Sequence, residues 1–135
     1  MKTAEQELLD AMMSLADSLG YTVYPYKQLD DVDYPFLEMV ETEDYPEASK
    51  RGAEDFGIAV LIVHGWGDVN DRTTLSAQLK SLMNKTRRIK GVYYNYTQQE
   101  QNTNTTISNE TSTGGVLVHG IGVYQYQYSR RNDNG

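Results

Sequence analysis

Cysteine and long apolar segments are both missing from this sequence. The absence of cysteine excludes disulfide bonds, thiolate zinc sites and cysteine nucleophiles. No stretch approaches the ~20 apolar residues that cross a bilayer, and residues 1–7 lack the apolar core of a secretory signal. We therefore expect a soluble protein that is made in the cytoplasm and has no membrane partner.

Basic residues are also few, with 12 Lys and Arg against 19 Asp and Glu and a formal net charge of -7. Residues 1–60 hold 14 acids and 4 bases, whereas residues 61–135 hold 5 acids and 8 bases. The acidic total argues against a dedicated nucleic-acid-binding protein, which carries a basic face. If copies pack side by side, the opposite charges of the two halves could set their orientation; an ordinary charged surface explains them equally well.

Histidine is scarce too, and both copies, His64 and His119, lie in apolar segments without an acid next to them in the sequence. Two imidazoles alone do not form a metal site, so we predict structural roles for both. The acidic residues Asp30, Asp31 and Asp33 lack the glycine and terminal glutamate of a calcium loop and indicate a solvated turn. We predict no catalytic, metal-binding or cofactor-binding residues, and therefore not an enzyme.

Glycines 120 and 122 do not form a dinucleotide fingerprint, because no third glycine follows at the required distance and no helix opens after them. They indicate a strand that another backbone approaches closely.

The length suits one domain over residues 1–135. A first helix is predicted over 4–19, because apolar residues recur there at helical spacing. Thr3 and Gln6 have the spacing of a capping box, and Gly20 suits the C-cap.

A second helix is predicted over about 71–86, capped by Asn70 or Asp71. A basic cluster follows its last turn and complements the helix dipole. The same cluster would suit phosphate or an acidic neighbouring subunit; its members are Lys85, Arg87, Arg88 and Lys90.

Five segments have the alternation or the apolar composition of strands: 21–27, 36–43, 56–66, 89–97 and 115–128. The most apolar of them, 56–66, is predicted to be central and buried on both faces. Polar and apolar residues are poorly sorted between the two faces of 36–43, which favours an edge or interface strand. Residues 44–55 are expected to form a solvated loop.

Segments 89–97 and 115–128 are predicted to pair as a long hairpin. The polar residues 98–114 between them would form an extended arm or a mobile loop, and 129–135 a flexible tail. The predicted fold class is α+β, with a mixed or antiparallel sheet of about four to six strands, two flanking helices and a long β-hairpin arm.

Three segments in order carry a family resemblance. They are an acidic turn leading into an aromatic-proline strand (Leu29–Glu38), the apolar strand Ile58–Gly67 with the polar cap and helix after it, and the polar loop running into a Leu-x-His-Gly strand (Ser112–Val123). Together they resemble the tail terminator and tail-completion proteins of siphophages that infect Gram-positive bacteria.

The resemblance implies a virion protein at the tail-head neck. Such subunits form a homo-hexameric ring on the last ring of major tail tube protein, stop tube growth and offer a surface to the head-completion or connector protein. Genomic DNA passes through the ring without specific binding. The family brings no catalytic residues and no cofactor.

Tyrosine supplies eleven of the fourteen aromatic residues, and its ring and hydroxyl suit a wet interface. We therefore expect the tyrosine-rich strands, together with the basic cluster, to contact partners. The candidate interface residues are Tyr93, Tyr94, Tyr96, Tyr124, Tyr126, Tyr128, Arg87 and Arg88.

Two hypotheses follow from this prediction: the 98–114 arm contacts the tube or a neighbouring subunit, and acids from the first half line the DNA channel. The alternatives are a head-completion or stopper protein of the neck and a small ligand-binding or regulatory α+β domain from outside phages.

Overall fold

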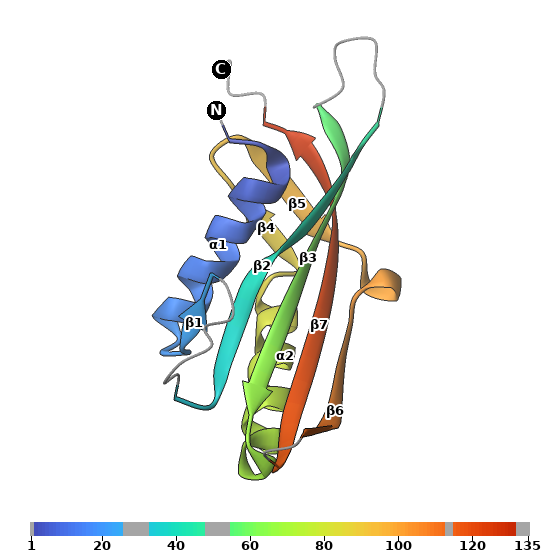
Figure 1. Cartoon of the computed structure of the whole chain (residues 1–135). Helices are drawn as coiled ribbons and strands as arrows, with labels where there is room; N and C mark the ends of the chain where they lie inside the picture. Colours follow the sequence, from blue (N-terminus) through green and yellow to red (C-terminus); the bar gives the residue numbers. More distant parts are fainter. Residues whose placement is uncertain (1, 26–32, 48–54, 113–114, 132–135) are drawn as a thin grey trace.

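The computed structural model describes residues 2–25, 33–47, 55–112 and 115–131. Its elements in chain order are α1 (Ala4–Ser18), β1 (Val23–Tyr24), β2 (Phe36–Pro46), β3 (Phe56–Gly67), η1 (Val69–Asp71), α2 (Arg72–Lys85), β4 (Arg88–Lys90), β5 (Tyr94–Gln98), η2 (Glu100–Asn102), β6 (Asn104–Ser112) and β7 (Gly115–Arg130) (Figure 1).

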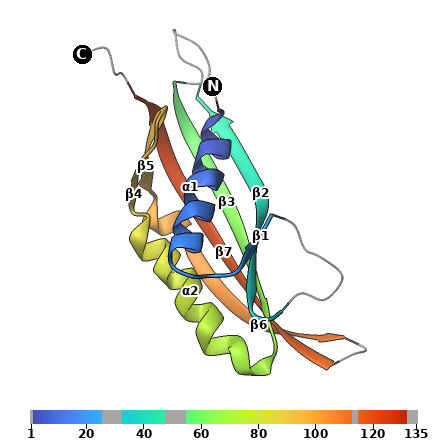
Figure 2. The same cartoon turned by 90° about the vertical axis from the view of Figure 1, so that its left-hand side faces the viewer.

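The seven described strands form one sheet in the order β1-β2-β3-β7-β5-β4, and β6 also pairs with β7. The β1-β2 pair is parallel, whereas the other pairs are antiparallel. Both helices pack on the same face of the sheet, which leaves the opposite face without a described helix (Figure 2). The α+β prediction with a mixed sheet is therefore confirmed, with one strand more than the predicted range.

The longest strand, β7, organises the sheet. One of its edges pairs with β3 over twelve residues. Its other edge pairs with β6 along residues 115–123 and with β5 along 126–130. The predicted arm therefore includes a nine-residue strand, β6, that is paired along its whole length.

As predicted, β3 is central, between β2 and β7. On the helix side Ala59, Leu61 and Val63 are fully buried. On the other side Val60 is buried, but Ile62 is only partly covered. The prediction of burial on both faces therefore holds for part of the strand.

The core lies between the sheet and the two helices. Leucines of α2 and the apolar stripe of α1 pack against strand residues there, and five tyrosine rings fill the space beneath them. These rings are Tyr94, Tyr96, Tyr124, Tyr126 and Tyr128, each no more than 1% exposed. Burial of a phenol hydroxyl is tolerated where it finds a partner inside the fold, as the hydroxyls of Tyr96, Tyr124, Tyr126 and Tyr128 do.

The tyrosine hydroxyls bind to backbone carbonyls of the helices and to a side chain of a strand. Tyr124 donates to the Leu79 carbonyl at 2.8 Å and Tyr96 to the Ala4 carbonyl at 2.7 Å. Tyr128 donates to Asp44 Oδ1 at 2.8 Å. Tyrosine at these positions therefore serves as a large apolar filler that also satisfies buried backbone carbonyls.

Glu7 of α1 fixes the turn between β4 and β5. Its carboxylate accepts hydrogen bonds from the Tyr93 and Tyr94 backbone N–H groups at 2.9 and 3.1 Å and from the Tyr96 hydroxyl at 3.1 Å. The side chain is buried, so these bonds replace the water that a carboxylate otherwise needs.

Helix ends differ in part from the predictions. Thr3 makes no side-chain cap bond, so the expected capping box is not formed, whereas Gly20 adopts φ 81° as a C-cap glycine does. Asp71 holds the N-cap position of α2, as predicted, but makes no side-chain cap bond there. The capping box belongs to η1: Asp68 accepts from the Asn70 N–H at 2.8 Å, and Asp71 accepts from the Asp68 N–H at 2.8 Å. Asp71 thus supplies the reciprocal bond of the box.

Several predicted boundaries were wrong because pairing within the sheet overrides local composition. Only Val23–Tyr24 of 21–27 forms a described strand, and 44–46 continue β2 instead of starting a loop. The 89–97 segment is two strands, β4 and β5. The first residues of the predicted flexible tail, 129 and 130, belong to β7. Asp30, Asp31, residues 48–54 and 132–135 lie outside the described residues.

Candidate interaction surface

The face of the sheet that lacks helices is the candidate site. Its buried apolar residues, Phe36, Val60 and Trp66, do not belong to the core cluster beneath the helices. Around them lie partly covered isoleucines and valine of β3 and β7: Ile58, Ile62, Ile121 and Val123. This open face combines a thin apolar layer with the polar side chains described next.

A bulge in β2 determines which acids lie on the open face. The register shifts between Met39 and Glu41. Before the shift, Leu37 and Met39 point into the core; after it, Glu41 and Glu43 stand opposite Ile62 and Val60 of the open face. A bulge inserts one residue and so reverses the alternation of the strand, which places exposed acids on this face.

Both histidines lie on the open face in one hydrogen-bonded row. The ring nitrogens His64 Nδ1 and His119 Nε2 are 2.9 Å apart. His64 Nε2 lies 2.8 Å from Glu41, and His119 Nδ1 lies 2.7 Å from Glu110. The Trp66 ring stacks on the His119 ring, with centroids 3.9 Å apart and planes 7° from parallel. The row Glu41-His64-His119-Glu110 is called the histidine relay below, and it joins β2, β3, β7 and β6.

Proton counting constrains the relay. An ionised carboxylate can only accept, so each glutamate accepts a hydrogen bond from an N–H of the imidazole beside it. The nitrogens that remain, His64 Nδ1 and His119 Nε2, face one another and need one more proton to bond. A hydrogen bond at each of the three contacts of the relay therefore requires three ring protons on the two imidazoles.

Sequence reasoning missed the relay because neither histidine has an acid beside it in the chain. The signal lies in strand register: His119 is the partner of Trp66, two residues beyond His64 on β3. The sequence alone does not show that β3 and β7 are neighbours, so this register could not be predicted from it.

The acidic edge comprises the exposed glutamates of β2 and the residue after it: Glu41, Glu43 and Glu47. Tyr45 stands between them, is 54% exposed and donates its hydroxyl to Glu43. Beyond Glu38, no strand among the described residues pairs with the outer side of β2. The prediction of an edge strand therefore holds for the second half of β2.

The basic edge is the strand edge of the sheet opposite to the acidic edge, and it consists of β4. Its side chains Arg88 and Lys90 are exposed, and Val92 and Tyr93 of the following turn are 70% and 36% exposed. A shallow hollow of about 490 Å³ borders this edge, lined in part by Lys90, Val92 and Tyr93.

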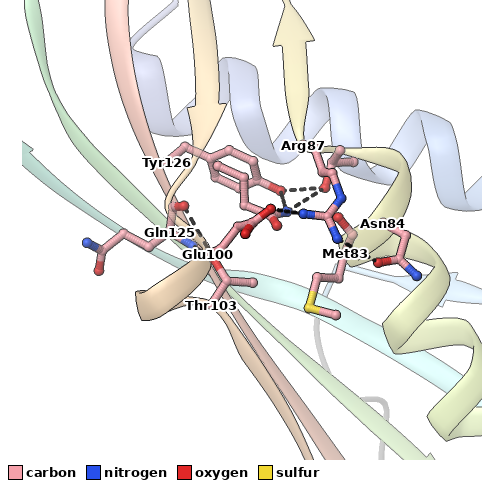
Figure 3. Close-up of polar contacts among 9 residues, drawn as sticks. Met83, Asn84, Arg87, Glu100, Thr103, Gln125 and Tyr126 are labelled. Atoms are coloured by element: carbon pink, nitrogen blue, oxygen red, sulfur yellow. Dashed lines mark hydrogen bonds and ion pairs between the residues drawn. The ribbon is translucent and has the colours of Figure 1, made fainter.

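Figure 3 shows the polar contacts around the end of α2 and the start of β4. Thr86 Oγ1 lies 2.6 Å from the Tyr126 hydroxyl, and Gln98 Nε2 donates to the Met83 carbonyl at 2.9 Å. Arg87 forms an ion pair with Glu100 of η2. Arg87 is therefore engaged within its own chain, whereas Arg88 projects from the edge.

Five of the six candidate interface tyrosines lie in the core, so their side chains offer no surface to a partner. The strand alternation was predicted correctly, with Tyr124, Tyr126 and Tyr128 on one side and the glutamines on the other. That side is the helix-covered one. The exposed candidates are Tyr93, Arg87 and Arg88.

The paired glycines of β7 make room for side chains. A Cβ on Gly122 would lie 2.5–2.7 Å from the Tyr124 ring, and one on Gly120 would lie 2.8–2.9 Å from Leu79 and Ile107 methyl groups. We expected another backbone to approach these glycines closely. The closest groups are instead side chains: the Tyr124 ring at Gly122 and the methyl groups of Leu79 and Ile107 at Gly120.

Among the described residues, no group of three or more His, Asp or Glu side chains is arranged to hold a metal ion. No described helix is both long and apolar enough to span a membrane. The sequence matches no protein-family model and no curated protein.

Proposed function

We propose that the protein is a structural subunit of a long-tailed bacteriophage, the tail terminator that caps the head-proximal end of the tail tube. The observation that carries the proposal is a large sheet with both helices on one face and an acid-bearing opposite face. In a ring, that arrangement allows helices outside and the open face toward a central channel.

The charge of the open face suits a channel for DNA. Glu38, Glu41 and Glu43 all lie on it, and like charge would keep the phosphate backbone from binding to the wall. Arg88 and Lys90 share this face but lie on β4, at the edge of the sheet opposite to these acids. We propose that the genome passes through the ring without being held.

The β6-β7 hairpin supports a role in contacts with other subunits. It projects away from α2 at one end of the sheet (Figure 2), and β6 consists mainly of Asn, Thr and Ser. A strand edge of this kind can add to the sheet of a neighbour. The proposed partners are the tube protein on one side and the head-completion protein on the other.

Polymerisation of purified tail tube protein tests the capping role directly. Adding this protein to growing tubes should stop elongation at one end only, and electron microscopy should show a distinct terminal ring there. Tubes that reach the same length distribution with and without the protein would contradict the proposal.

A further inference from the structure

We infer that the acidic edge of β2 in one copy pairs with the basic edge of β4 in the next copy, so that the sheet continues from subunit to subunit. This inference rests on the proposed ring, and it names the surfaces by which a second copy of the chain is recognised.

The two edges lie in the same rows of the sheet. Successive antiparallel pairings connect them across β3, β7 and β5. One such row runs through Tyr45, Ile58, Gln127, Thr97 and Arg88. Two residues further along β4, Lys90 lies in the same row as Phe56. The Phe56 carbonyl accepts a hydrogen bond from the Glu47 N–H, so Glu47 lies in that row as well.

Strand direction favours this contact. Four antiparallel pairings separate β2 from β4, so the two edge strands run in the same direction. A cyclic operator places the β2 edge of one copy beside the β4 edge of the next without reversing either strand. The new pair is therefore parallel and head-to-tail, as ring closure requires.

Backbone groups on both edges point outward. Gly91 donates to the Tyr94 carbonyl and Gln98 to the Arg87 carbonyl, both at 2.8 Å, which by alternation turns the N–H and C=O groups of Arg88 and Lys90 away from β5. On β2, the same alternation turns the backbone of Thr42 away from β3. Pro46 follows at an outward position, where its missing N–H costs no bond within the sheet.

Charge selects the partner edge. Exposed glutamates on an edge strand oppose pairing with an identical strand, since like charges would face each other. The same glutamates attract the arginine and lysine of β4. When the rows of the two copies are aligned, Glu43 and Glu47 lie two residues to either side of the row that contains Arg88. Glu47 then lies in the row that contains Lys90. The charges thus exclude two-fold contacts and favour the head-to-tail one.

Engineered cysteines test the contact, because the natural chain has none. A chain with both Tyr45→Cys and Arg88→Cys should form a ladder of disulfide-linked oligomers under mild oxidation. Within one copy the two positions are separated by three strands, so a bond between them must join two copies. Replacing Arg88→Cys by Thr106→Cys, on the edge of β6, should abolish the ladder.

Charge exchange provides the second arm. Glu43→Lys with Glu47→Lys should weaken self-association about tenfold or more, as should Arg88→Glu with Lys90→Glu; all four changes together should restore it. Circular dichroism of each variant verifies folding. If the wild type forms rings while the ladder is absent and the charge variants assemble normally, the edge pairing is overturned and the proposed function stands. A wild type that forms no oligomer even with tail tube protein would overturn both.

Discussion

His64 Nδ1 lies 2.9 Å from His119 Nε2, and each ring is anchored by a glutamate on its far side. Because both carboxylates accept, a hydrogen bond between the two rings requires a third ring proton. Glu38, the register partner of His64, adds a further negative charge on the same face. The histidine relay therefore lies among three carboxylates on the open face.

A double-mutant cycle should detect this coupling. Changing His64→Ala and His119→Ala, singly and together, should give a coupling free energy of about 1 kcal/mol. A coupling near zero would show that the two rings do not stabilise each other.

The carboxylate of Glu7 should be important for stability. Glu7→Ala removes the acceptor for two backbone N–H groups and the Tyr96 hydroxyl, and should lower the free energy of unfolding by about 3 kcal/mol. Urea denaturation measures this change. Ser14→Ala, at an exposed position of the same helix, serves as the control and should have little effect. Equal losses in the two variants would contradict the role assigned to Glu7.

The buried tyrosines should make the protein sensitive to alkali. Burial raises the pKa of Tyr124, and burial together with Glu7 raises the pKa of Tyr96. A folded pKa above the unfolded value means that stability is intact below about pH 10 and falls as the pH rises further. Tyrosinate absorbance should therefore rise cooperatively, together with loss of the circular dichroism signal. Gradual ionisation of these rings in a protein that stays folded would contradict their burial.

Gly122 should tolerate no side chain. A Cβ there would lie within 2.7 Å of the Tyr124 ring, so Gly122→Ala should cost about 1–3 kcal/mol through overpacking. Ser129→Ala, at an exposed position of the same strand, should change stability by less than about 0.5 kcal/mol. Thermal unfolding of the two variants provides the comparison; a melting temperature for Gly122→Ala that matches the control would show that the ring has room to move.

Periodicity predicted both helices, the central position of β3 and the shared orientation of the β7 tyrosines. It could not show which side of β7 the helices would cover, because alternation identifies two faces without saying which one is buried. The tyrosines were therefore assigned to an interface, although their rings and hydroxyls are accommodated in the core.

Two other features could not be predicted because they depend on pairing between distant segments. The bulge after Met39 moves Glu41 and Glu43 to the open face, and no local signal in the sequence marks it. The polar composition of 104–112 indicated an arm or a loop, yet pairing with β7 satisfies its backbone and makes it a strand. The acidic edge and the histidine relay both depend on these pairings.

Electron microscopy of particles made when the gene is disrupted in the proposed phage tests the central claim most directly, with tail length and head attachment scored. The proposed terminator predicts overlong tails of variable length, unattached, beside filled heads. Free tails of normal length would contradict a terminating role and favour a joining protein of the neck, whereas intact infectious particles would exclude the protein from the neck altogether.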